Sequence, residues 1–95
     1  MDVRFYVDPK TDEPHIYNHR VTKDEVAEVL NNPGEDRPGR EGSRSAIGRT
    51  RAGRYLRVIY VTDPDPGSVF VVTACELKGK PLTAHRRRQQ RKGSR

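Results

Sequence analysis

Residues 44–61 constrain the fold more than any other part of the chain, because two potential strands flank a short polar segment there. That segment, residues 50–53, ends in glycine and is typical of a β-hairpin turn. We therefore predict antiparallel strands at about residues 43–50 and 54–62. This hairpin also carries the arginines Arg44, Arg49, Arg54 and Arg57. Because guanidinium groups match phosphate geometry bidentately, we expect the hairpin to face a polyanion.

Side chains along the second strand of the hairpin alternate between two faces of the predicted sheet. One face carries Tyr55, Arg57, Ile59 and Val61. The opposite face carries Arg54, Leu56, Val58 and Tyr60. The polar residues lie near the turn, so we expect the arginines to cluster at one end of the sheet.

Residues 22–25 form a capping box, in which a threonine hydroxyl caps the first amides of a helix and a glutamate reaches back. Val26, Val29 and Leu30 follow at helical spacing. The Asn-Asn-Pro-Gly sequence at residues 31–34 is expected to end the helix. We therefore predict one short amphipathic helix here.

The predicted order of elements is strand, helix and three antiparallel strands. Residues 3–7 form the first strand, and residues 68–75 form a last strand nearly continuous in apolar residues. That continuity predicts a strand buried on both faces, near the middle of the sheet. The fold class is α+β, with the N-terminal strand and short helix packed on a small antiparallel sheet. We expect one domain over residues 1–84 and a basic C-terminal tail, helical or disordered, over residues 85–95.

The net charge of +6 is distributed unevenly along the chain. Residues 1–36 hold four basic and nine acidic groups, whereas residues 37–57 hold seven arginines and one glutamate. Residues 84–95 add six basic groups and no acidic group. Two basic blocks beside an acidic segment favour a polyanionic partner at one end of the molecule.

Three features of the sequence predict a cytoplasmic protein. It has no run of about 18 apolar residues that could span a membrane. Its first residues lack the basic and apolar segments of a signal peptide. Its single cysteine, Cys75, forms no internal disulfide.

Several segments together resemble a known family. They are Ile-Gly-Arg-Thr at residues 47–50, the strand at 53–60, the strand at 71–77 and the basic C-terminus, preceded by a histidine-bearing segment and a capped acidic helix at 15–30. The pattern is similar to that of the BrnT toxins and related domains, within the RelE-like superfamily of type II toxin–antitoxin systems. The resemblance covers roughly residues 15–88.

This resemblance implies a RelE-like fold and a metal-independent endoribonuclease that promotes attack of a 2′-hydroxyl on the adjacent phosphate of mRNA. No metal or other cofactor is implied. The RNA is either free or bound to the ribosome. The implied protein partner is a cognate antitoxin, usually encoded alongside and often carrying a ribbon-helix-helix domain.

Cleavage of this kind requires a proton acceptor, a cation for the phosphorane and a proton donor for the leaving oxygen. The candidate catalytic residues are His15, His19, Arg49, Arg57 and Glu76. The candidate RNA-binding residues are Arg44, Arg54, Tyr55, Lys78, Lys80, His85, Arg86, Arg87 and Arg88. The spacing of the first two histidines puts them on one face of a helical turn and also suits a metal, but no further cysteine or histidine lies nearby.

Each candidate also has a structural interpretation. Strand arginines contribute to solubility, a histidine can pack against the sheet, and Glu76 can form a salt bridge with a neighbouring arginine. His85 can supply a proton or belong to a solvated tail. Three functions therefore stay open at this point: an endoribonuclease toxin, a non-catalytic RNA- or DNA-binding module, and a degenerate toxin relative with a structural or regulatory role.

Overall fold

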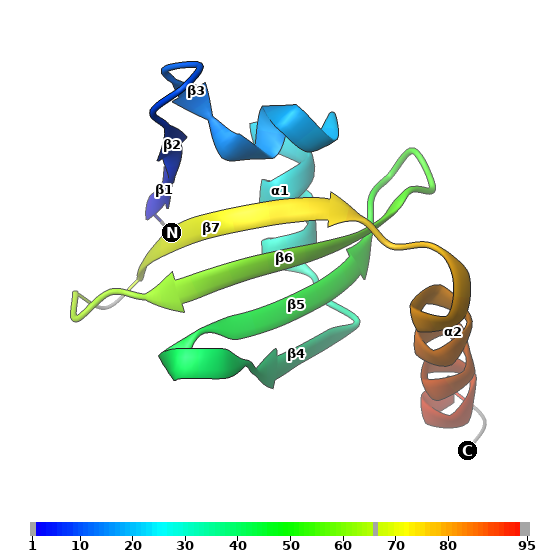
Figure 1. Cartoon of the computed structure of the whole chain (residues 1–95). Coiled ribbons are helices and arrows are strands. Elements are labelled where there is room, and N and C mark those ends of the chain that lie inside the picture. The colour runs from blue at the N-terminus through cyan, green and yellow to red at the C-terminus, as the bar shows by residue number, and fades with distance from the viewer. Residues whose placement is uncertain (1, 66, 94–95) are drawn as a thin grey trace.

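The computed structural model describes residues 2–65 and 67–93 of an α+β protein with one mixed five-stranded sheet and a second, two-stranded sheet (Figure 1). The elements in chain order are β1 (Asp2–Phe5), β2 (Val7–Asp8), β3 (Glu13–Pro14), the 3-10 helix η1 (His15–His19), α1 (Lys23–Asn31), β4 (Glu35–Pro38), the 3-10 helix η2 (Arg40–Gly42), β5 (Arg44–Arg49), β6 (Tyr55–Thr62), β7 (Ser68–Glu76) and α2 (Gly79–Gly93).

The sequence predicted an antiparallel sheet, but the main sheet is mixed. Its strand order is β1-β7-β6-β5-β4, and β1 pairs with β7 in the parallel direction while the other neighbours are antiparallel. After β1 the chain passes through β2, β3, η1 and α1, and it then forms β4 at the opposite edge of the sheet. The side-chain pattern of a short strand does not encode the direction of its partner, so this pairing was not predictable from residues 3–7.

The predicted hairpin is present as β5 and β6, with Arg49 opposite Tyr55. The Gly53 amide donates to the Thr50 carbonyl oxygen at 2.9 Å, and Gly53 adopts a φ of +90°. Glycine reaches this left-handed region without steric cost, which explains its position at the end of the turn.

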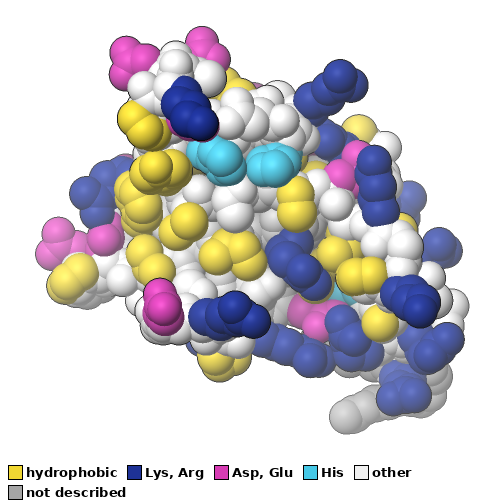
Figure 2. All heavy atoms as spheres, in the orientation of Figure 1, with side chains coloured by type: hydrophobic (Ala, Val, Ile, Leu, Met, Phe, Trp, Pro, Cys, Tyr) yellow, Lys and Arg dark blue, Asp and Glu magenta, His cyan; other side chains and the backbone are white. Residues whose placement is uncertain are grey.

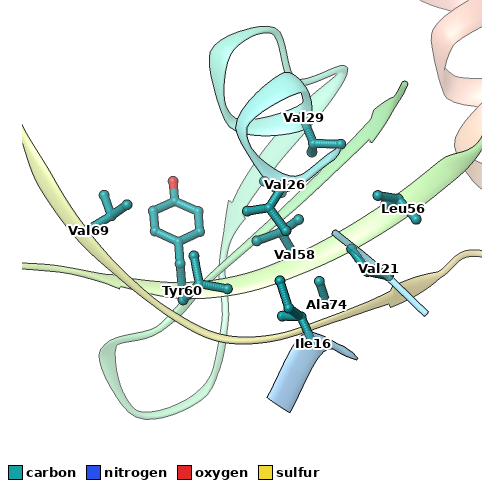
Figure 3. Packing of buried hydrophobic residues seen from close by; sticks show 11 residues of the cluster. Ile16, Val21, Val26, Val29, Leu56, Val58, Tyr60, Val69 and Ala74 are labelled. Carbon is teal, nitrogen blue, oxygen red and sulfur yellow. The ribbon is translucent and has the colours of Figure 1, made fainter. Parts of the chain in front are cut away.

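Helix α1 begins and ends where the sequence predicted. The Thr22 hydroxyl accepts from the Glu25 amide, and the Glu25 carboxylate accepts from the Thr22 amide, which completes the capping box. Val26 and Val29 are fully buried. They pack on one face of the sheet with Leu56 and other residues from β6, β7 and η1 (Figure 3). This layer of helix on sheet is the hydrophobic core.

Strand β7 lies inside the sheet, between β1 and β6, but only one of its faces is buried, so the prediction of burial on both faces was wrong. Val69, Val71 and Ala74 belong to the core. Val72 is 37% exposed, and Phe70 is half-buried. A β-branched run marks strand propensity but does not reveal whether a second layer covers it. In Figure 1, α1 lies behind the sheet, and α2 lies beyond the end of the strands.

The C-terminal segment forms a helix, α2, that runs through the expected boundary between residues 84 and 85. His85 is 2% exposed, so it belongs to the folded domain and not to a solvated tail. Among the described residues, no helix is both long enough and apolar enough to cross a membrane.

Candidate nucleic-acid interface

The face of the main sheet opposite α1, called the open face below, carries a row of side chains from four adjacent strands. Glu35, Ile47, Arg57 and Cys75 are register partners across β4, β5, β6 and β7. Directly opposed residues point to the same side of a sheet, so these four side chains share the open face. In Figure 2, which views this side, basic side chains gather over α2 and hydrophobic ones lie over β6 and β7.

The four arginines of the hairpin divide between the two faces and do not cluster at one end, which corrects the sequence-based expectation. Arg44 lies opposite Tyr60, at the end of β5 remote from the turn, and its Nε is 2.9 Å from Oδ1 of Asp36. Arg49 and Arg57 lie on the open face, because they occupy the alternate positions of β5 and β6.

Arg54 is held on the α1 side of the sheet. Its Nη1 donates to both carboxylate oxygens of Glu25 at 3.0 Å and to the Arg20 carbonyl oxygen at 2.8 Å. Its Nε donates to Glu76 at 3.2 Å, as the salt-bridge interpretation of Glu76 allowed. Burial lowers the pKa of Arg54, but the hydrogen bonds and charges of the two carboxylates outweigh it and leave the pKa raised. This arginine therefore connects β6 with α1 and β7.

Arg57 differs from Arg44 and Arg54 in having no carboxylate partner among the described residues. Its Nε is buried and has no hydrogen-bond acceptor within residues 2–65 and 67–93. A buried donor without an acceptor costs about 1–3 kcal/mol, and most such groups in folded proteins are satisfied. An external oxygen acceptor would remove that cost only after a shift of the side chain, because the Nε has essentially no exposed surface.

Arg49 and Tyr55 form a cation–π contact at the turn end of the open face. The Arg49 guanidinium carbon lies 5.6 Å from the centroid of the Tyr55 ring. The other neighbour of Tyr55 is the His85 ring, with centroids 5.7 Å apart and planes at 70°. A cation over an aromatic ring is attracted by the ring quadrupole, which orients the guanidinium.

Helix α2 is fixed to the sheet through one buried carboxylate that sequence reasoning did not single out. Oε1 of Glu35 lies 2.5 Å from Nδ1 of His85 and 2.9 Å from Nε of Arg88. Gln89 Nε2 also donates to the Gly34 carbonyl oxygen at 3.0 Å. Burial raises the pKa of Glu35, but hydrogen bonds from Arg88 and His85 outweigh this effect and lower the pKa overall. No local motif distinguishes Glu35 from the other charged residues of its segment.

His15 and His19 lie on η1 at the β7 edge, with their ring centroids 5.2 Å apart. Nδ1 of His15 is 3.4 Å from Oδ2 of Asp8, so this histidine has a carboxylate neighbour. The His19 side chain contacts His15 but forms no ion pair with a described residue. In the described part of the chain, no cluster of three or more His, Cys, Asp or Glu side chains could hold a metal ion.

A cavity of about 440 Å³ lies between η1 and the end of β7. Its walls include His19, Arg54, Cys75, Glu76 and Lys78. Cys75 is also the register partner of Arg57 on the neighbouring strand. Cys75 therefore lies between Arg57, its neighbour on the open face, and the cavity that His19 and Lys78 line.

The structure sorts the remaining candidates into separate surfaces. Arg86 and Arg87 are exposed on α2 beside a second cavity, and Lys80 is exposed near the start of that helix. Arg88 points toward the sheet and forms a salt bridge with Glu35 of β4. The candidates brought to the open face and its α2 border are thus Arg49, Tyr55, Arg57, His85 and Arg88. Arg44 is remote from that group.

Comparison of the chain with protein-family models, with curated proteins and with solved structures finds no match. The functional argument therefore rests on the arrangement of this chain's own side chains.

Proposed function

We propose that this protein binds single-stranded RNA on the open face and cleaves it as a metal-independent endoribonuclease of the RelE-like toxin class. The single observation that carries the proposal is Arg57, whose buried Nε has no acceptor in the described structure. A phosphate supplies a charge partner for this guanidinium and, if binding turns the side chain outward, an acceptor for its Nε. The surrounding surface adds Arg49 and the basic side chains of α2, which suits a polyanion longer than a single phosphate.

The proposed chemistry is attack of the ribose 2′-hydroxyl on the adjacent phosphate, with departure of the 5′-oxygen. Arg57 neutralises the charge that develops on the phosphorane, a role suited to a permanently charged fork of donors. His19 accepts the 2′-hydroxyl proton, and Lys78 of the same cavity donates a proton to the leaving 5′-oxygen. The products are a 2′,3′-cyclic phosphate and a 5′-hydroxyl.

A second candidate function is a non-catalytic RNA-binding module. It is favoured by the contacts of His15 and His85, the two histidines that the proposed cleavage does not use. His15 lies beside Asp8, and His85 is buried against Glu35. Both rings are therefore used in contacts within the protein. A protein that only binds RNA needs the arginines and Tyr55 but not a free imidazole.

One set of variants tests binding and cleavage separately. Binding of a labelled single-stranded RNA is measured by fluorescence anisotropy, and cleavage is measured on the same RNA with analysis of the product ends. We expect Arg57→Ala to weaken binding about tenfold, since charge-assisted hydrogen bonds contribute about 1.5–3 kcal/mol. His19→Asn should remove cleavage and leave binding within about twofold.

The matched control is Lys23→Gln, which removes one positive charge from α1 on the opposite side of the sheet. It should leave both binding and cleavage unchanged. Equal losses in Lys23→Gln and Arg57→Ala would show that only net charge matters and would contradict the proposed site. Cleavage that persists in His19→Asn would remove His19 from the mechanism, and binding without cleavage by the wild-type protein would favour the second candidate.

We also propose a protein antitoxin as a partner, in keeping with the toxin class. Ile59, Val61 and Phe70 lie half-buried on the open face, beside the arginine surface. A partner segment with apolar anchors and carboxylates would cover both regions. Co-expression with the neighbouring gene product should yield a complex that does not cleave RNA, and free, active protein after co-expression would refute this pairing.

A further inference from the structure

A cavity of about 370 Å³ lies where the open face meets α2, away from the cavity at the β7 edge. Its walls come from the end of α1, the hairpin and α2, and they include Asn32, Arg49, Tyr55, His85 and Gln89. Its volume is within the range of small-ligand sites, about 300–1,000 Å³. The proposed chemistry at Arg57, His19 and Lys78 does not use this cavity.

One wall of the cavity combines a guanidinium with two aromatic rings. Arg49 lies over the Tyr55 ring at 5.6 Å, and the His85 ring packs edge-on to Tyr55. His85 is 2% exposed and contacts the Glu35 carboxylate, so the position of the His85 ring in this wall is fixed. Nucleobases stack on aromatic rings and on guanidinium planes, and this stacking contributes about 1–3 kcal/mol per base to single-strand binding.

The cavity also contains carboxamide groups that can contact the edge of a base. The Asn32 side chain makes no hydrogen bond within the described residues and is exposed. Gln89 uses its Nε2 on the Gly34 carbonyl oxygen, which leaves Oε1 as an acceptor. A carboxamide that is free to donate and accept matches an amino donor next to a ring-nitrogen acceptor, a pair that adenine and unpaired cytosine present and uracil does not. Adenine is favoured over cytosine because its two fused rings offer a larger surface for stacking.

We propose that this cavity binds one unpaired adenine base of the RNA, stacked on the Arg49 guanidinium and contacted at its edge by Asn32. The proposal rests on the proposed function, because it assumes that RNA lies across the open face. It adds a base preference to that function. Because His85 and Gln89 both belong to α2, the cavity exists only while this helix is docked.

The test compares the affinities of labelled oligoadenylate, oligocytidylate and oligouridylate of equal length for the full-length protein. The wild type should bind oligoadenylate at least about fivefold more tightly than oligouridylate. Arg49→Lys keeps the charge but removes the plane, and should weaken oligoadenylate binding about tenfold while preserving its salt dependence. Asn32→Ala should bring the affinities for the three oligonucleotides within about twofold of one another.

The matched control is Arg51→Lys, an exposed arginine of the same hairpin turn that does not line the cavity. It should bind all three oligonucleotides as the wild type does. An unchanged adenine preference in both Arg49→Lys and Asn32→Ala would overturn the inference. If the wild type shows no base preference while Arg57→Ala still weakens all three, the cavity inference is wrong and the proposed function stands. Absence of binding to any RNA would refute both.

Discussion

Replacing Glu35 with glutamine should release α2 from the sheet, because this carboxylate is the centre of its attachment. The Glu35 side chain is 7% exposed. Its Oε1 lies 2.5 Å from Nδ1 of His85, and 2.8 and 2.9 Å from Nη2 and Nε of Arg88. Glutamine keeps the shape and one acceptor but loses the charge. Hydrogen bonds to charged groups contribute about 1.5–3 kcal/mol, against about 0.5–1.5 for neutral ones. Since Arg88 is 36% exposed and partly screened, we expect a net loss of about 1.5 kcal/mol.

The assay is urea and thermal unfolding followed by circular dichroism. A loss of about 1.5 kcal/mol corresponds to a fall in the melting temperature of about 6–12 °C for a domain of this size. Glu13→Gln is the matched control, since this glutamate is exposed and has no ion pair among the described residues. Equal stabilities of Glu35→Gln and the wild type would refute the reasoning.

The same substitution predicts a change in the pH dependence of stability. The folded-state pKa of Glu35 is lowered, so its contribution is fully present above the unfolded pKa of about 4.3. The contribution is lost as the pH falls through the folded pKa, because protonation removes the charge that holds Arg88 and His85. Glu35→Gln should therefore differ most from the wild type near neutral pH and converge with it in acid. A constant difference at all pH values would show that the carboxylate charge is not responsible.

Two further predictions separate the structural arginines from the proposed functional ones. Arg54→Ala should lower the free energy of unfolding by about 2 kcal/mol, because it leaves the Glu25 carboxylate without its guanidinium, and should weaken RNA binding less than Arg57→Ala does. Urea titration and anisotropy on the same samples measure both effects, and the reverse order would contradict the assignment. The double variant Arg86→Gln, Arg87→Gln should reduce the slope of log affinity against log salt by about 1.4, since each phosphate contact on single-stranded RNA contributes about 0.7. An unchanged slope would show that this exposed side of α2 does not touch RNA.

Features encoded over a few consecutive residues were predictable. The glycine that ends the 50–53 turn requires a positive φ, and the Thr22–Glu25 capping box satisfies amides within one helical turn. The division of side chains along β6 also followed from strand geometry, since successive residues alternate between faces. These features depend on local backbone geometry and need no knowledge of the rest of the chain.

The arrangement of the candidate site was less predictable. Alternation separated Arg54 from Arg57. It could not show that carboxylates from α1 and β7 would meet Arg54, while the Nε of Arg57 finds no acceptor among the described residues. Glu35 and His85 are fifty residues apart and meet only because α2 packs beside β4. A salt bridge over such a separation leaves no periodic signal in either segment.

The sequence by itself determined the hairpin, the capped helix, the α+β class and the concentration of positive charge in two blocks. Only the tertiary structure decided that β1 joins β7 in parallel, that one face of the sheet is left open and that α2 is anchored by a buried carboxylate. The reason is the range of the interactions involved. Turns and caps are formed by neighbours in the chain, whereas burial and ion pairing depend on which distant surfaces come into contact.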